Sequence, residues 1–213
     1  MKLIIHNNGK FMKLYYTRGA CSLAVRISIH EMGIPCEFES VDLKEKKTEK
    51  GADYFKINAK GSVPALQLSN GELLTENAVI QQYLADTHKA TTLLPAIGDM
   101  RRYRVLEWLN FISTDLHKNC SPLFNSQISD DLKETIFKPI LKSKLTIADQ
   151  HLQNHKFFTG DQVALCDGYL FVVLNWAVKM KIDLAQWPNL SRFFADMKQR
   201  KSVQQALSEE GIS

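Results

Sequence analysis

The sequence predicts an α/β domain followed by an all-helical domain, and two observations carry this prediction. Up to residue 88 the chain alternates short runs of strand formers with amphipathic helical segments, whereas the pattern after residue 99 is helical only. Strands that alternate with helices are typical of α/β domains. At 213 residues, the chain is long enough for two small domains.

The α/β domain is expected to open with a strand, a helix and a second strand. Residues 13–16 are rich in strand formers. Residues 21–32 have apolar side chains at helical spacing and are followed by Gly33, a residue suited to end a helix. Residues 36–43 alternate apolar and polar side chains, as half-buried strands do. These segments predict a β-α-β unit with parallel strands.

The rest of this domain is predicted to be a hairpin with flanking helices. A short helix is expected near residues 52–57. Two apolar runs then flank Ser69-Asn70-Gly71, and Asn-Gly between such runs is a strong hairpin signal. Thr75-Glu76 is expected to cap the next helix, with the Thr75 hydroxyl accepting a hydrogen bond from its first turn. The order β-α-β-α-β-β-α over residues 12–88 indicates a thioredoxin-like domain, with residues 1–11 as an extension.

Beyond a linker at residues 89–98, the pattern predicts a helical bundle over residues 99–213. One face of its first helix is apolar: Val105, Leu109, Ile112 and Leu116. Residues 130–153 predict a second amphipathic helix, which Pro139 is expected to bend or interrupt. Residues 169–178 are apolar on nearly all sides, so that helix is expected at the centre of the domain. Residues 190–197 and 203–207 predict the last helical turns.

Charge and hydropathy argue against nucleic-acid and membrane partners. The net charge of +4 comes from 27 basic and 23 acidic residues, and the densest charged run, residues 44–50, alternates in sign. Such alternation is typical of a solvated surface. No apolar run reaches the ~18–20 residues that cross a bilayer. The first residues lack a secretory apolar region. We therefore expect a cytoplasmic protein.

Cys21 is the first candidate for chemistry, because it lies where a predicted strand gives way to a helix. The free N–H groups and partial positive charge of a helix N-terminus favour a thiolate, and we expect Arg18 to act in the same direction. The alternative is a small buried hydrophobic residue, which is what most free cysteines are. The other three cysteines lie in apolar patterns or loops, and no pair has the spacing of a metal site: Cys36, Cys120 and Cys166.

The segment after Cys21 reads Ser22-Leu23-Ala24, so no resolving cysteine follows at the usual spacing. A single thiol forms a mixed disulfide with an external thiol, not an internal disulfide. This favours a protein that handles a small thiol such as glutathione over a thioredoxin-type reductase.

Three further features suggest a binding site. Val63 precedes a proline at the start of the third strand, where its backbone is free to pair with a peptide. Glu76, at a helix start, is suited to hold an ammonium group, although a helix dipole alone also favours an acid there. Asn110, Thr114 and His117 are spaced to form one polar stripe on a helix.

From residue 12 onward the chain resembles the bacterial beta-class glutathione S-transferases. The matching segments occur in order along nearly the whole chain. They are Lys13-Leu14-Tyr15-Tyr16, Gly19-Ala20-Cys21-Ser22-Leu23, Val41-Asp42-Leu43, Lys46-Lys47-Thr48, Gly61-Ser62-Val63-Pro64-Ala65-Leu66, Leu74-Thr75-Glu76, Glu107-Trp108-Leu109-Asn110-Phe111, His117-Lys118 and Ser121-Pro122-Leu123-Phe124.

The resemblance implies a cytosolic homodimer that conjugates glutathione, as co-substrate and without a metal, to hydrophobic electrophiles. It implies that Cys21 and His117 are catalytic, with Ser22 as a rival for the stabilising role. The glutathione-binding residues that it implies are Cys21, Lys46, Val63, Glu76, Asn77, Asn110, Thr114, Asp115 and His117. The electrophile is expected to lie against Phe111, Ile112 and Trp176.

Two other functions stay open at this point. One is glutaredoxin-like exchange, in which Cys21 releases glutathione from mixed disulfides. The other is binding of glutathione without catalysis. The chain also departs from the family pattern at Asn77, where Ser or Gly is usual, and at Ala164, which replaces the Ser or Thr of a helix cap. Loss of that cap is expected to cost about 1 kcal/mol of stability.

Overall fold

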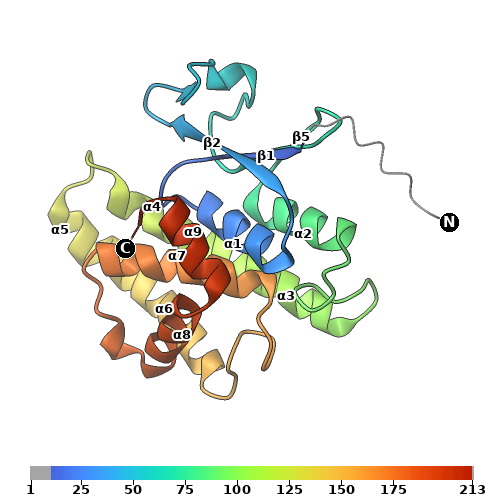
Figure 1. Cartoon of the computed structure of the whole chain (residues 1–213). Helices are drawn as coiled ribbons and strands as arrows, with labels where there is room; N and C mark the ends of the chain where they lie inside the picture. The colour runs from blue at the N-terminus through green and yellow to red at the C-terminus, as the bar shows by residue number, and fades with distance from the viewer. Residues whose placement is uncertain (1–10, 213) are drawn as a thin grey trace.

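A five-stranded mixed sheet forms the N-terminal part of the chain in the computed structural model, which describes residues 11–212 (Figure 1). The strands are β1 (Met12–Tyr16), β2 (Cys36–Asp42), β3 (Lys47–Thr48), β4 (Ala65–Gln67) and β5 (Leu73–Thr75), in the spatial order β3-β2-β1-β4-β5. As predicted, β1 and β2 are parallel, and β4 and β5 form an antiparallel hairpin. The predicted extension, apart from Phe11, lies outside the described residues.

Three helical segments belong to this part: α1 (Ser22–Met32), η1 (Tyr54–Lys56) and α2 (Asn77–Thr87). Helix α1 ends, as predicted, at Gly33, whose left-handed φ of 63° suits a residue without a Cβ. The cap of α2 lies within the predicted Thr75-Glu76 pair, but the predicted hydrogen bond from the first turn to Thr75 is wrong. Glu76 is the capping residue, with a φ of 73° and no side-chain cap bond. Thr75 ends β5, and its hydroxyl accepts a hydrogen bond from Lys60 instead.

The C-terminal part is helical throughout. Its segments are α3 (Met100–Phe111), η2 (Ile112–His117), α4 (Lys118–Phe124), α5 (Asp130–Leu132), η3 (Lys133–Phe137), α6 (Lys138–Leu152), α7 (Leu165–Lys179), η4 (Leu184–Gln186), α8 (Pro188–Lys198) and α9 (Lys201–Glu209). The η2 and η3 stretches are π-helical. Residues 130–152 form one unbroken helical run, and Pro139 directly follows its π-helical stretch η3, so the α-helix is interrupted there as predicted, because proline has no N–H to donate to the preceding turn.

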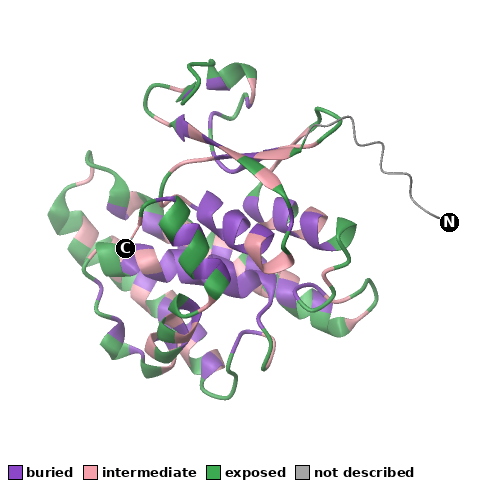
Figure 2. Cartoon of the chain, in the orientation of Figure 1, coloured by how far each residue is buried: buried purple, intermediate pink, exposed green. Residues whose placement is uncertain are grey.

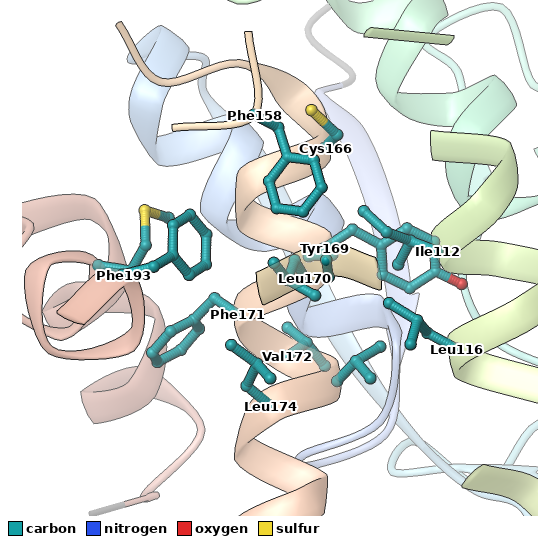
Figure 3. Close-up of a cluster of buried hydrophobic side chains, with 14 of the residues drawn as sticks. Ile112, Leu116, Phe158, Cys166, Tyr169, Leu170, Phe171, Val172, Leu174 and Phe193 are labelled. Carbon is teal, nitrogen blue, oxygen red and sulfur yellow. The ribbon is translucent and has the colours of Figure 1, made fainter. Parts of the chain in front are cut away.

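Helix α7 runs through the centre of the helical part, as its apolar sequence predicted (Figure 2). Figure 3 shows its side chains among those of neighbouring helices, such as Leu116 and Phe193. Most of the α7 residues are buried. Burial on all sides explains why this segment has no polar face.

Helix α1 belongs to both parts of the molecule. Val25 and Ile29 pack with Leu14 under the sheet, whereas Leu23 and Ile27 join the helical core. A Cβ on Gly168 of α7 would lie 3.3 Å from Ile27, so the glycine permits this close approach. The N-terminus of α1 therefore lies where sheet and bundle meet.

The opposite face of the sheet is covered by the segment around η1. Tyr54 is fully buried there beside Tyr15 and Val63. Its hydroxyl donates to the Ser62 carbonyl at 2.9 Å, and the Asn58 side-chain amide donates to the same oxygen at 2.8 Å. These bonds fix the backbone just before the Val63-Pro64 bond, which is cis. Within residues 11–212, no helix is long and apolar enough to cross a membrane.

Candidate functional site

A cavity of about 680 Å³ lies between the sheet domain and the helical bundle. It is lined by Arg18, Gly19, Ala20, Cys21, Leu43, Ser62, Val63, Pro64, Glu76 and Asn77 from the first part, and by Ser113, His117, Lys118, Ser121, Phe124, Tyr169, Trp176 and Lys179 from the second. Concave sites at such junctions are where small molecules bind most often.

Cys21 immediately precedes α1, as predicted, but its thiol is buried and not ionised. The side chain donates a hydrogen bond from Sγ to the Val63 carbonyl at 3.3 Å. Burial raises the pKa of Cys21 to about 11, since removal from water penalises the thiolate more than the nearby donors stabilise it. Arg18 does not act on the thiol as expected, because its guanidinium donates to the Gly211 carbonyl.

A chain of side-chain amides holds the backbone of Cys21. The Asn77 amide donates to the Cys21 carbonyl at 2.6 Å. Its own oxygen accepts from Gln81 at 2.5 Å, and Gln81 in turn accepts from the Ser28 hydroxyl at 2.8 Å. All three supporting side chains belong to buried residues. Both the nitrogen and the oxygen of the Asn77 side chain are thus hydrogen-bonded to the protein, although the residue also lines the cavity.

The loop before Cys21 is held from the helical part through Gly19. The Gly19 N–H donates to Glu210 at 2.7 Å, and the Gly19 carbonyl accepts from the Trp176 indole at 2.7 Å. Glu210 also accepts from the buried Arg26 at 3.1 Å. The chain end and α7 together therefore set the position of this loop.

On the helical side, His117 hydrogen-bonds through Nδ1 to the Tyr169 hydroxyl at 2.5 Å, and its ring lies edge-on to Trp176 at 4.8 Å. Burial, assisted by the charge of Lys118, lowers the pKa of His117 to about 4. Burial also raises the pKa of Tyr169 above its usual range. Both groups are uncharged at neutral pH.

The cavity brings together five of the predicted residues: Cys21, Val63, Glu76, Asn77 and His117. Glu76 is exposed and forms a 2.6 Å ion pair with Lys60. Lys46 does not line the cavity, but its ammonium donates to the Gly61 carbonyl at 2.7 Å, beside the cavity wall.

Four other predicted residues do not line the cavity. Ser22 is fully buried, and its hydroxyl bonds with the Thr17 backbone. Asn110 and Thr114 are exposed, and Asp115 pairs with Lys144 at 2.8 Å. The prediction of one polar stripe assumed an α-helix with 3.6 residues per turn. The stretch η2 is π-helical and has more residues per turn, so His117 does not share a face with Asn110 and Thr114.

Several lining residues were missed by the sequence analysis. Tyr169 is the clearest case, and the available signal was a hydroxyl in an otherwise apolar helix. Phe124 and Lys179 gave no local signal. Of the three residues expected to contact the electrophile, Trp176 lines the cavity, whereas Ile112 is fully buried in the core and Phe111 packs on Trp108.

Cys36, Cys120 and Cys166 lie away from the cavity and are not disulfide-bonded. Burial raises the pKa of Cys120 to about 12. Among residues 11–212, no cluster of three or more His, Cys, Asp or Glu side chains is arranged to hold a metal ion.

Both parts of the chain match models of one protein family. Residues 19–87 match the glutathione S-transferase N-terminal domain, and residues 127–201 match the glutathione S-transferase C-terminal domain. The glutathione S-transferase GstA of Escherichia coli O157:H7 is 42% identical over 201 residues, which cover 94% of this chain and all of that protein.

Solved structures of bacterial proteins agree with these matches. A ternary complex of BphK, a bacterial GST, superposes with a TM-score of 0.90 at 44% identity and covers 94% of this chain and all of its own. A sphingomonad glutathione S-transferase complexed with glutathione gives a TM-score of 0.89 at 39% identity, with the same coverage of both chains. The sequence match to GstA and the two structural matches each cover 94% of this chain.

Proposed function

The chain belongs to the glutathione S-transferase family and has the fold of its bacterial beta class, and from that premise we propose that it conjugates glutathione to electrophilic small molecules in the cavity next to Cys21. The observation that carries the proposal is the composition of the cavity. Backbone and carboxylate groups of the sheet domain, at Val63 and Glu76, face His117 and Trp176 of the bundle. The groups at Val63 and Glu76 suit a peptide-like thiol, and His117 and Trp176 suit the molecule with which that thiol reacts.

The proposed reaction is attack by the thiolate of glutathione on an electrophilic carbon. With an aryl chloride, a carbon–sulfur bond forms, chloride leaves with the carbon–chlorine electron pair, and the thiol proton passes to solvent. The neutral His117 is suited to donate a hydrogen bond to that thiolate. When Tyr169 donates to Nδ1, the imidazole proton resides on Nε2 and is available to the ligand.

Turnover of 1-chloro-2,4-dinitrobenzene with glutathione tests this proposal. We expect the native enzyme to be active, and His117→Phe to lower kcat/KM about 10- to 100-fold, the size of a hydrogen bond to a charged group. His155→Phe, at an exposed histidine outside the cavity, is the matched control. No turnover by the native enzyme contradicts conjugation, and full activity of His117→Phe contradicts only the role of the histidine.

We further propose that Cys21 forms a mixed disulfide with glutathione. Cys21 lines the cavity, whereas Cys36, Cys120 and Cys166 do not. The Cys21 thiolate attacks one sulfur of oxidised glutathione, the disulfide breaks, and one glutathione thiolate leaves. Because burial raises the pKa of Cys21 to about 11, the reaction is expected to be slow at neutral pH.

Intact mass after incubation with oxidised glutathione tests this second step. We expect one adduct, formed faster with rising pH, and none on Cys21→Ser. A comparison with Cys36→Ser is the control, because Cys36 is half-exposed but outside the cavity. An adduct that persists on Cys21→Ser contradicts the assignment.

The remaining expectations from the sequence extend this proposal. We propose a cytoplasmic homodimer that acts on hydrophobic electrophiles, with domains at residues 12–88 and 99–213. Lys46 is proposed to contact a carboxylate of glutathione from its position beside Gly61. Sedimentation at micromolar concentration gives the oligomeric state, and a Lys46→Gln variant with a raised KM for glutathione supports the contact.

A further inference from the structure

Two lysines on the bundle side of the cavity have no carboxylate partner among residues 11–212. Lys118 begins α4 and Lys179 ends α7, and both are exposed at the cavity wall. The Lys179 ammonium extends to the loop before Cys21, where it lies 3.4 Å from the position of a Cβ on Gly19.

The wall between these lysines is aromatic. Phe124 of α4 lies edge-on to Trp176 of α7 with their ring centroids 5.7 Å apart, and the His117 ring lies edge-on to the same indole at 4.8 Å. Helices α4 and α7 contact each other, so the two lysines flank one continuous surface. Planar rings pack well against such a surface in offset or edge-on contacts.

Among residues 11–212, one carboxylate lines the cavity, and it lies on the opposite side. Glu76 belongs to the sheet domain and is already paired with Lys60 at 2.6 Å. The histidine of the bundle side is neutral, because burial lowers its pKa to about 4. The charge on the bundle side is therefore positive at neutral pH.

We propose that the second substrate of this enzyme is a planar aromatic electrophile with a carboxylate, whose ring lies on Phe124 and Trp176 and whose anionic group pairs with Lys118 and Lys179. This inference rests on the proposed conjugating function. An anion placed against an aromatic wall loses part of its hydration, and two unpaired ammonium groups offset that loss. The same charges attract the anion from solution and raise its rate of association.

A pair of electrophiles with the same ring tests the inference: 4-chloro-3,5-dinitrobenzoate and the neutral 4-chloro-3,5-dinitrobenzamide. In each reaction, glutathione sulfur replaces chloride. The kcat/KM of each substrate is divided by its uncatalysed rate with glutathione, which removes their different intrinsic reactivity. We expect the native enzyme to favour the acid about fivefold at low salt, the size expected for two exposed ion pairs, and to lose most of this preference in 0.5 M NaCl.

The double variant Lys118→Gln/Lys179→Gln is expected to lose the preference for the acid, measured as the ratio of the two normalised kcat/KM values, so that a change common to both substrates does not affect the result. Lys198→Gln/Lys201→Gln is the control, because it removes the same charge from exposed positions outside the cavity. The KM for glutathione is measured for every variant.

Three outcomes overturn the inference and are distinguishable from failure of the proposed function. The first is that the native enzyme has no preference for the acid, and the second is that the control variant loses the preference as much as the double variant does. The third is that, in the double variant, the KM for glutathione rises and turnover of both electrophiles falls by the same factor, which assigns the two lysines to glutathione binding. Absence of turnover with both electrophiles, and with 1-chloro-2,4-dinitrobenzene, contradicts the conjugating function itself.

Discussion

His117 illustrates how one side chain acquires its properties from its surroundings. It contacts Tyr169 and Trp176 and lies next to Lys118, and its burial together with the positive charge of Lys118 disfavours the imidazolium. A free histidine is half-protonated near pH 6.5, whereas here burial lowers the pKa to about 4. The ring is therefore a neutral hydrogen-bonding group throughout the physiological range.

This pKa predicts a dependence of stability on pH. The unfolded chain binds a proton at His117 near pH 6.5 and the folded chain only near pH 4, so this residue stabilises the fold above pH 6.5 and the contribution is lost as the pH falls. Between pH 7 and 4.5, the free energy of unfolding should fall by about 2 kcal/mol more in the native protein than in His117→Asn. Urea unfolding at both pH values measures this, and equal losses contradict it.

At the scale of one element, the N-terminus of α7 is only half capped. Asp167 accepts hydrogen bonds from the N–H groups of Ala164 and Phe158, at 2.7 and 2.9 Å. Ala164 occupies the capping position with extended backbone angles, but its methyl group accepts no hydrogen bond. Burial raises the pKa of Asp167 to about 7 despite its two donors. The helix at the centre of the bundle thus starts with one side-chain cap instead of two.

We predict that Ala164→Ser stabilises the protein by about 1 kcal/mol, because the new hydroxyl accepts a hydrogen bond from the Asp167 N–H. The free energy of unfolding in urea measures the gain. Ala164→Cys is the matched control, since its side chain has nearly the same shape and is a weak acceptor. The explanation is wrong if the serine and cysteine variants have the same stability.

At the scale of the molecule, the end of the chain ties the bundle to the sheet domain. Arg26 of α1 is buried and donates to Glu209 at 2.8 Å and to Glu210 at 3.1 Å. The guanidinium also lies over the rings of Tyr16 and Phe38. Since Glu210 accepts the Gly19 N–H as well, residues far apart in the sequence share one buried network.

We expect Glu210→Gln to lower the free energy of unfolding by about 3 kcal/mol, because it leaves the buried Arg26 guanidinium without its buried partner. Glu209→Gln should cost about 1 kcal/mol or less, since the Glu209 side chain is one-third exposed and water screens its ion pair. Chemical denaturation of both variants tests the difference. Equal losses would show that burial does not decide the strength of these two contacts.

The sequence by itself determined the order of the elements and the two-part fold. Period-two and helical patterns, Gly33 after α1 and Asn70-Gly71 in the hairpin are local signals, and each acts within a few residues of its own position. The position of Cys21 at the start of α1 followed from the same local reasoning. The apolar sequence of α7 also determined its central place.

The tertiary structure decided the properties of the site, because these depend on residues that are distant in the sequence. The thiol of Cys21 is at a helix N-terminus, which favours ionisation, yet its burial beneath Val63 prevails and raises its pKa to about 11. Asn110 and Thr114 do not line the cavity with His117, because the π-helical stretch η2 has more residues per turn than an α-helix, and no local propensity predicts it. Tyr169 and Lys179 join the cavity only because α7 packs against α1 and α4.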